Sequence, residues 1–324
     1  MSDELLKLEH LNIDYKVKGG VLSAVHDVNL SIRSGEIFAV VGESGCGKTT
    51  VAHSIMNLLP GSNARIEGKI LFDGRDLRSC SRKEMEQIRG RDIGMIFQNP
   101  LDSLNPVYTT GKQVKEAILL DHVEKKEAWE KVIRLFQDVK MPDARERVNS
   151  YPHELSGGMR QRVMIAMMLS RNPRLLIADE PTTALDVTIE AQILDILREL
   201  KETRNTSIML ITHNFGLVAE AADRIAVMYA GEVIETGDVY EIFEHPAHPY
   251  TRLLMQALPR KTKKEGRLQT IEGSVPRILD KKPGCRFANR CPYAAKQCHE
   301  ETPQENRLSE THTYRCFLAD RQEV

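Results

Sequence analysis

The chain has 324 residues, of which 41% are hydrophobic and 28% charged, and its formal net charge is −1. The length predicts one large domain with an appendage, and the balanced charge gives no electrostatic reason to expect nucleic acid as a partner. The first residues lack the layout of a secretory signal, and no apolar stretch approaches the length of a membrane span. We therefore expect any role at a membrane to come through partner proteins.

Residues up to about position 75 are predicted to form short strands with turns, including strands at 37–41 and 69–72. From about 98 to 172 the pattern becomes helical, because apolar residues recur at the spacing of one helix face. The residues with this spacing are Val132, Leu135, Phe136 and Val139.

Two short buried strands, at 175–178 and 208–212, flank an amphipathic helix that contains residues 189–200. Strands that alternate with helices predict an α/β domain with a mainly parallel sheet. The segment 259–284 is rich in Lys and Arg and has little periodicity, so it is predicted to be a linker.

A glycine-rich segment between the strand at 37–41 and a helix-compatible run at 50–59 fits the pattern G-x-x-x-x-G-K-[ST]. Its residues are Gly42, Glu43, Ser44, Gly45, Cys46, Gly47, Lys48 and Thr49. Such a loop curls backbone N–H groups around a phosphate at the positive end of a helix. Lys48 is expected to bind the β- and γ-phosphates, and the Thr49 hydroxyl to bind Mg²⁺. We expect Cys46 to contribute only its backbone.

The buried strand at 175–178 is followed by Asp179 and Glu180. A carboxylate at this end of a strand can hold the Mg²⁺ coordination shell, and that role suits Asp179. Glu180 is expected to orient the attacking water or to accept its proton.

The segment 155–161, LSGGMRQ, resembles the signature sequence of ABC ATPases, and it stands shortly before the paired acids, as in that family. Ser156 is a good helix N-cap, and Gly157 and Gly158 expose backbone N–H groups at a helix start. The resemblance implies a P-loop ABC ATPase core, with a RecA-like sheet, an antiparallel β arm and an inserted helical subdomain at about 98–172. It also implies a head-to-tail dimer, in which Ser156, Gly157, Gly158 and Gln161 serve the nucleotide of the opposite subunit.

Further residues match motifs of the same family. Gln98 resembles the Q-loop glutamine, and His213 resembles the switch histidine. Ala184-Leu185-Asp186 resembles the D-loop, which lies at the dimer interface and here contains Asp186. The resemblance implies that Tyr15 stacks on adenine, that Thr50 joins the ATP-binding loop, and that Thr49, Gln98 and Asp179 bind Mg²⁺. The implied catalytic residues are Lys48, Gln98, Glu180 and His213. Asn214 stands where the family usually has Asp. Because Asn can form similar hydrogen bonds, we expect only the local charge to differ.

The segment from Glu244 to Thr251 and the run after Gly273 resemble the C-terminal extension of dipeptide and oligopeptide importer ATPases. This resemblance implies a nucleotide-binding domain at 1–245, an extension and linker at 246–284, and a C-terminal lobe at 285–324. It also implies an ATPase at the cytoplasmic face of the membrane, with a second ATPase subunit, two permeases and an external peptide-binding protein as partners. Transport of nickel or another small solute stays open, as does a soluble ABC ATPase with a redox-sensing cluster.

The last four cysteines are separated by five, six and seventeen residues: Cys285, Cys291, Cys298 and Cys316. Stable disulfides are not expected in reducing cytosol, and the spacing leaves zinc, an iron–sulfur cluster and unligated thiols open. The resemblance to the importer ATPases implies a [4Fe–4S] cluster. His245 and His248 are predicted to form a proline-rich turn that enters a helix. Because the linker separates the lobe from the nucleotide motifs in sequence, we expect the lobe to have no part in ATP chemistry.

Overall fold

The computed structural model describes residues 4–59, 63–98, 103–183, 185–257 and 271–318. The chain begins with two long strands, β1 (Glu4–Val17) and β2 (Gly20–Arg33). The prediction of short strands is wrong here, because each of the two is 14 residues long. Leu6, Leu8, Leu11 and Ile13 of β1 are all buried. The pairing of β1 with β4 (Ala64–Phe72) shifts its register between Glu9 and Asn12. This shift explains why Leu6 and Leu8 are buried before it and Leu11 and Ile13 after it, three residues instead of two separating Leu8 from Leu11.

Contacts divide the chain into two compact units. Unit 1 consists of Met1–Ile32, Phe38–Ser79 and Thr212–Val324, and unit 2 of Arg33–Ile37 and Cys80–Ile211. The C-terminal residues therefore belong to the same unit as the glycine-rich loop.

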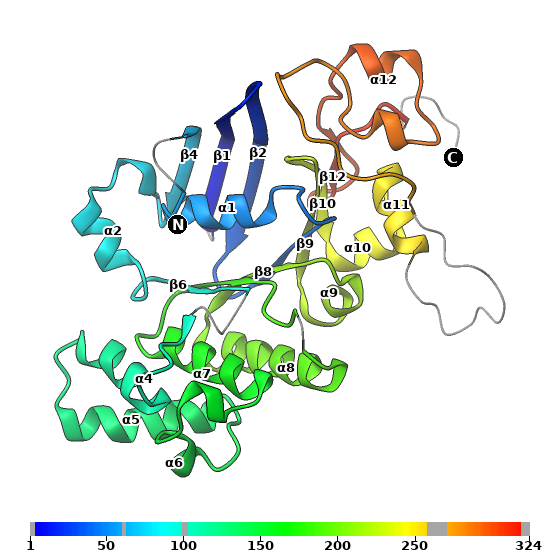
Figure 1. The fold of residues 1–324 in the computed structure, drawn as a ribbon. Helices are drawn as coiled ribbons and strands as arrows, with labels where there is room; N and C mark the ends of the chain where they lie inside the picture. The colour runs from blue at the N-terminus through cyan, green and yellow to red at the C-terminus, as the bar shows by residue number, and fades with distance from the viewer. Residues whose placement is uncertain (1–3, 60–62, 99–102, 184, 258–270, 319–324) are drawn as a thin grey trace, which may run out of the picture. The chain divides into compact units, whose positions relative to one another are not determined.

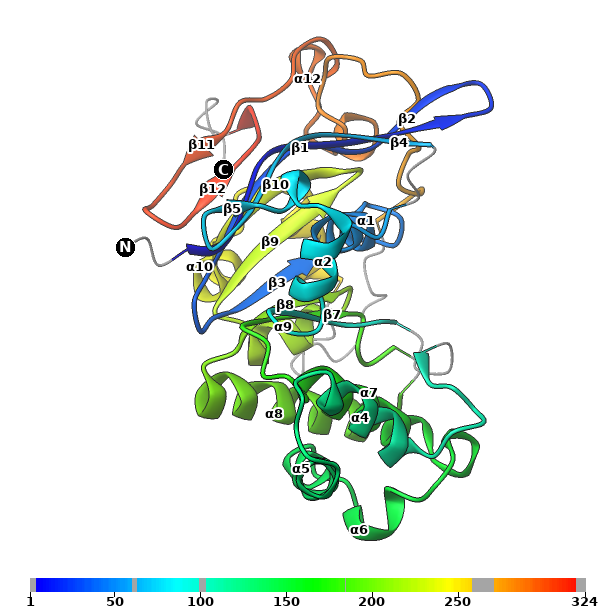
Figure 2. The same cartoon turned by 90° about the vertical axis from the view of Figure 1, so that its left-hand side faces the viewer.

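Unit 1 contains an antiparallel sheet in the order β2-β1-β4-β5, in agreement with the predicted antiparallel arm. It also contains a mixed sheet with the neighbours β11-β12-β10-β9-β3, in which β3 and β9 are parallel and the other pairs antiparallel. Figure 2 shows the hairpin of β11 and β12 in red. The remaining strands of the two sheets are β3 (Ile37–Val41), β4 (Ala64–Phe72), β5 (Arg75–Asp76), β9 (Arg224–Tyr229), β10 (Glu232–Asp238), β11 (Asn306–Arg307) and β12 (Thr313–Tyr314).

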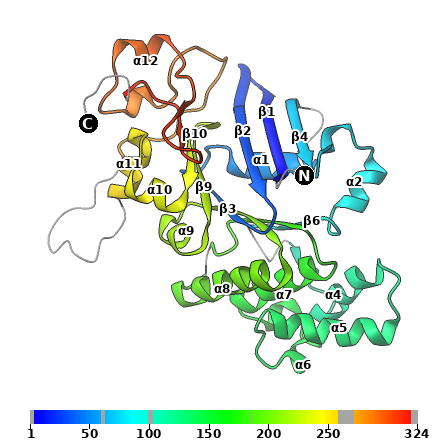
Figure 3. The same cartoon turned by 180° about the vertical axis from the view of Figure 1, so that it is seen from behind.

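Short helices accompany these sheets: α1 (Lys48–Ile55), α9 (Phe215–Ala221), α10 (Val239–Glu244), α11 (Pro249–Gln256), α12 (Lys296–Glu300) and the 3-10 turns Leu77–Ser79 and Ala288–Arg290. Figure 3 shows α10 and α11, in yellow, close to β9 and β10. The predicted run at 50–59 is helical only to Ile55, and α1 begins two residues earlier than the run, at Lys48.

Unit 2 contains the parallel strands β6 (Ile93–Ile96), β7 (Leu175–Asp179) and β8 (Ser207–Thr212). Its helices are α2 (Arg82–Ile88), α4 (Thr110–Leu119), α5 (Lys125–Asp138), α6 (Ala144–Arg147), α7 (Gly157–Leu169), α8 (Val187–Arg204) and the 3-10 turn Pro152–Glu154. Helices α4, α5 and α7 pack on one another, as Figure 1 shows in green, through the apolar face predicted around Val132 and Phe136. Every residue of β6, β7 and β8 is buried, which explains their continuous apolar sequences.

Between 246 and 284, residues 258–270 of the predicted linker lie outside the described residues. The described part is not a detached tether, because Ile278 and Asp280 form backbone hydrogen bonds with β2. In the part of the chain that the structure describes, no helix has the length and apolarity that crossing a membrane requires.

Candidate functional site

The glycine-rich loop joins β3 to α1, as the sequence predicts. Gly42, Gly45 and Gly47 all have positive φ angles, of 154°, 81° and 106°. A Cβ atom at Gly42 would lie 2.2 Å from the carbonyl oxygen of Met228, so only glycine fits there. The loop is thus shaped by close backbone contacts within unit 1.

Lys48 lies inside this loop, with 4% of its surface exposed. Its ammonium donates hydrogen bonds to the carbonyl oxygens of Gly42, at 2.7 Å, and Glu43, at 3.1 Å. A cation held at the first turn of a helix, among the N–H groups of a glycine-rich loop, creates a site for a polyanion.

The other loop residues differ in exposure. Ser44, Gly45 and Thr49 are exposed, whereas Cys46 is 1% exposed. Burial raises the pKa of the Cys46 thiol, although Lys48 opposes the shift, so this thiol stays protonated and unreactive at neutral pH. This agrees with a purely backbone contribution of Cys46.

Tyr15 of β1 lies next to the loop helix, since its hydroxyl is close to the Thr50 side chain. Partial burial raises the pKa of the Tyr15 hydroxyl. The structure therefore brings the residue predicted to stack on adenine to the first turn of α1.

In unit 2, Asp179 ends β7 and is 2% exposed. Glu180 follows in a left-handed conformation with a φ of 46°, which is uncommon for a residue with a side chain. Its Oε2 accepts hydrogen bonds from Gln98 Nε2 and from the Thr183 hydroxyl, both at 2.9 Å. The structure thus joins the predicted base to the predicted Q-loop residue, 82 positions apart in sequence.

The signature segment forms the start of α7. Ser156 is its N-cap, and the hydroxyl accepts a hydrogen bond from Met159 N at 3.3 Å. A Cβ atom at Gly158 would lie 2.6 Å from Ile189 Cγ2, so α8 requires glycine there. Gln161, in the first turns of α7, is 1% exposed.

The remaining motif residues lie at the ends of strands and helices. Asp186 precedes α8 as its N-cap residue, while Ala184 lies outside the described residues. His213 follows β8 and is exposed. Asn214 caps α9 by accepting a hydrogen bond from Gly216 N at 3.0 Å, a task that an aspartate also performs.

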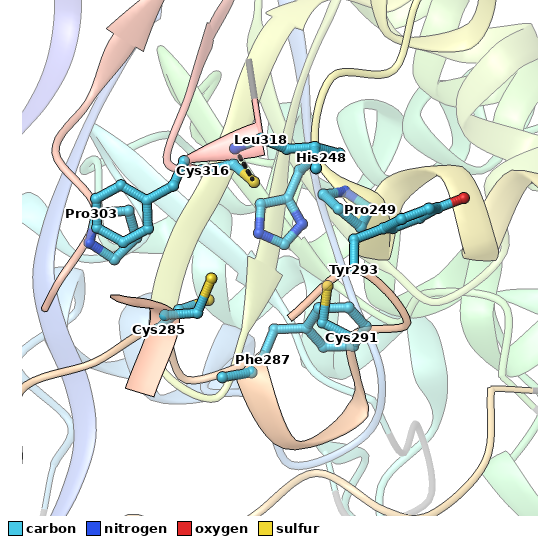
Figure 4. Close-up of a pocket in the computed structure, with 12 residues that line it drawn as sticks. His248, Pro249, Cys285, Phe287, Cys291, Tyr293, Pro303, Cys316 and Leu318 are labelled. Carbon is cyan, nitrogen blue, oxygen red and sulfur yellow. Dashed lines mark hydrogen bonds between the residues drawn. The ribbon is translucent and has the colours of Figure 1, made fainter. Parts of the chain in front are cut away.

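The four C-terminal cysteines line one pocket in unit 1, together with His248 and Phe287. Figure 4 shows the Cys285, Cys291 and Cys316 thiols around this pocket, with His248 between them. His248 is the N-cap of α11, as predicted for a turn entering a helix. No disulfide joins the cysteines in the described residues.

Four thiols around one pocket have the chemistry to bind a metal or a metal cluster, but their side chains are not arranged as a site for a single ion. No three His, Cys, Asp or Glu side chains among the described residues lie close enough together to hold one metal ion. Burial raises the pKa of the Cys285 thiol to about 12, so this thiol is protonated at neutral pH.

The cysteine segment contacts the glycine-rich loop, although the two are far apart in sequence. Arg290, between the first two of these cysteines, forms an ion pair with Glu43 of the glycine-rich loop, at 2.9 Å. Phe287 packs edge-on against Tyr229 and Tyr250. Sequence reasoning missed these contacts, because no local pattern pairs residues that are far apart in the chain, and Arg290 and Glu43 are 247 positions apart.

Comparison with known proteins shows which family this chain matches. A model of the ABC transporter family matches residues 25–183, and one of the oligopeptide/dipeptide transporter C-terminal region matches residues 234–298. The dipeptide transport ATP-binding protein DppD of Bacillus subtilis is 46% identical over 98% of this chain and 96% of its own length. The oligopeptide transport ATP-binding protein OppD of the same organism is 47% identical over 97% of this chain and 88% of its own length.

Solved structures agree on the fold. The ATP-binding cassette MJ0796, in a dimeric post-hydrolysis state with ADP and Pi, superposes with a TM-score of 0.65 at 28% identity. It covers 72% of this chain, which covers 98% of that cassette. CbiO1 from Clostridium perfringens, part of an ABC transporter complex, gives a TM-score of 0.66 at 30% identity, over 75% of this chain and 92% of its own. With the nucleotide motifs and the C-terminal region on one chain, this protein belongs to the ATP-binding subunits of the dipeptide/oligopeptide ABC transporters.

Proposed function

We propose that this protein is the motor of a peptide importer, in which ATP binding and hydrolysis drive the opening of a permease. The observation that carries the proposal is that one chain combines an ABC transporter region at 25–183 with the oligopeptide/dipeptide transporter C-terminal region at 234–298. ATP binding closes a dimer of cassettes, and hydrolysis reopens it. The dimeric state of the related cassette MJ0796 supports this cycle.

Each motif residue has a proposed task. Lys48 binds the β- and γ-phosphates, and Thr49, Gln98 and Asp179 would hold Mg²⁺, which neutralises phosphate charge. Glu180 orients the attacking water or accepts its proton, a role that its hydrogen bond from Gln98 supports.

The other tasks involve the γ-phosphate, the adenine ring of the nucleotide and the second subunit. His213 contacts the γ-phosphate, and Tyr15 stacks on adenine. Ser156, Gly157 and Gly158 bind the nucleotide of the other subunit, with Asp186 at the same interface. Ser156 is exposed at its helix start, which supports this assignment.

The proposed partners are a second ABC ATPase, identical or homologous, two permeases and an external peptide-binding protein. The chain would then lie at the cytoplasmic face of the membrane, held there by the permeases. This placement needs no membrane-spanning helix in the chain itself.

The test uses the purified protein and an importer reconstituted in vesicles from this protein and its partner permeases. Lys48→Ala is expected to abolish tight ATP binding, because it removes the cation from the phosphate loop. Glu180→Gln is expected to keep ATP binding and lose turnover by at least a hundredfold, since an amide is no base. ATP-dependent uptake of a labelled dipeptide supports the proposal, whereas uptake of nickel without peptide, or hydrolysis by Glu180→Gln at the unaltered rate, contradicts it.

We also propose that Cys285, Cys291, Cys298 and Cys316 hold a [4Fe–4S] cluster that stabilises the C-terminal segment. A segment of about forty residues buries too little apolar surface to stabilise itself. When bound, the cluster would supply covalent cross-links between the four thiolates.

The measurement is iron, sulfide and zinc content after anaerobic purification, with the visible spectrum. Four irons and four sulfides per chain are expected, and Cys298→Ser should lower them and increase cleavage of the segment by protease. Cys80→Ser is a matched control outside the pocket and should change neither. Stoichiometric zinc without sulfide contradicts the cluster.

A further inference from the structure

The phosphate loop of unit 1 is held from outside by residues of the C-terminal region. Both carboxylate oxygens of Glu43 accept hydrogen bonds from the Arg290 guanidinium, at 2.9 and 3.2 Å. The backbone N–H of Glu43 donates to the Tyr250 hydroxyl at 3.1 Å. Since Glu43 O also accepts from Lys48 Nζ, one loop residue connects the phosphate-binding lysine to the C-terminal region.

Arg290 is itself fixed in position. Its side chain is 9% exposed, against 26% for that of Glu43. Its Nε donates to the Glu272 carbonyl at 2.9 Å, and its guanidinium lies 5.7 Å from the ring centre of Tyr229. A planar guanidinium with this many partners keeps one orientation, so the bidentate pair with Glu43 is rigid.

Glu43 places a negative charge in a loop whose expected ligand is a polyanion. An unneutralised carboxylate there repels the phosphates, and a buried cation bound to it cancels that repulsion. The pair also restrains the backbone on which the loop N–H groups depend for their direction.

We propose that Arg290 is a positioning residue of the ATP site: it neutralises Glu43 and holds the phosphate loop in its binding shape. The proposal rests on the proposed ATPase function and adds to it a task for the segment between Cys285 and Cys291. Through Arg290, the cysteine segment acts on nucleotide affinity as well as on its own stability.

The experiment compares the ATP affinity of the unaltered protein with that of four variants, by nucleotide titration at concentrations too low for dimerisation. Arg290→Ala is expected to raise the Kd for ATP about tenfold, which corresponds to about 1.4 kcal/mol. Arg290→Lys keeps the charge but loses the bidentate geometry, so a smaller rise of about threefold is expected. If Arg290 acts through the carboxylate, the double variant Arg290→Ala/Glu43→Gln has the Kd of Glu43→Gln alone.

Arg315→Ala is the matched control, because Arg315 also joins the C-terminal region to the core, through an ion pair with Asp27 at 2.8 Å. Asp27 lies in β2 and not in the phosphate loop, so the Kd should stay unchanged. An unchanged Kd in Arg290→Ala overturns the proposal, as does an equal loss in Arg315→Ala or a tenfold loss that persists in the Glu43→Gln background. Failure of the proposed function is distinguishable, because then the unaltered protein and Lys48→Ala bind ATP equally poorly.

Discussion

Arg286→Met is expected to destabilise the protein by about 3 kcal/mol or more at pH 7.5, because it leaves Glu232 buried without its cation. Arg286 Nε lies 2.9 Å from Glu232 Oε1, and each side chain is 8% exposed. The guanidinium also donates to the Ala230 carbonyl and to the Ser23 hydroxyl. Methionine retains the aliphatic stem, so the change removes the charge and these hydrogen bonds with little loss of packing.

The loss of stability should depend on pH with a definite sign. Burial raises the pKa of Glu232 above its ordinary value of 4.5, and Arg286 opposes that shift, so removing Arg286 raises the pKa further. A carboxyl with a raised folded-state pKa is destabilising above its unfolded pKa and harmless below it. Relative to the unaltered protein, the destabilisation should therefore grow by up to about 1.4 kcal/mol per pH unit above the already raised folded-state pKa of Glu232. At pH values below that pKa, about 1 kcal/mol should remain from the lost hydrogen bonds.

The measurement is urea unfolding, followed by circular dichroism, between pH 5 and pH 8. Glu232→Gln and the double variant Arg286→Met/Glu232→Gln are the controls, since neither has a carboxyl at this position to titrate. The double variant should recover most of the stability that Arg286→Met loses at pH 7.5. A loss that is the same at pH 5 and pH 8, or a double variant as unstable as Arg286→Met, would refute the reasoning.

Three further changes test the nucleotide motifs. Tyr15→Ala should weaken ATP binding about tenfold, as expected for a lost stacking contact, whereas Tyr15→Phe should be nearly neutral. Equal losses in nucleotide titrations would assign the effect to the Tyr15 hydroxyl instead of the ring. Ser156→Arg should prevent ATP-driven dimerisation in sedimentation while the monomer still binds nucleotide, and a monomer that loses affinity would place Ser156 in its own site. Gly158→Ala should destabilise the protein by about 1–3 kcal/mol through overlap with Ile189, and Ile189→Ala in the same chain should relieve part of that loss in urea unfolding.

The sequence determined the local architecture of the phosphate loop and of the signature helix. The apolar run at 37–41 became β3 with the predicted bounds, because five consecutive buried residues satisfy a strand covered on both faces. Ser156 became the N-cap of α7 for a similarly local reason, since its hydroxyl accepts from an N–H three residues ahead. Signals of this kind act within a few residues and can be read directly from the sequence.

Only the tertiary structure decided which distant residues meet. The hydrogen bond from Gln98 to Glu180 joins positions 82 apart, and the ion pair of Arg290 with Glu43 joins positions 247 apart. The packing of unit 2 also decides that Gln161 of the signature segment is buried. Such pairings depend on how strands and helices pack after they form, and a charged residue in a loop has many possible partners of opposite sign. The cysteine segment contacts the phosphate loop in the folded protein, although most of the chain separates the two in sequence. Only the packing of the folded chain shows this contact.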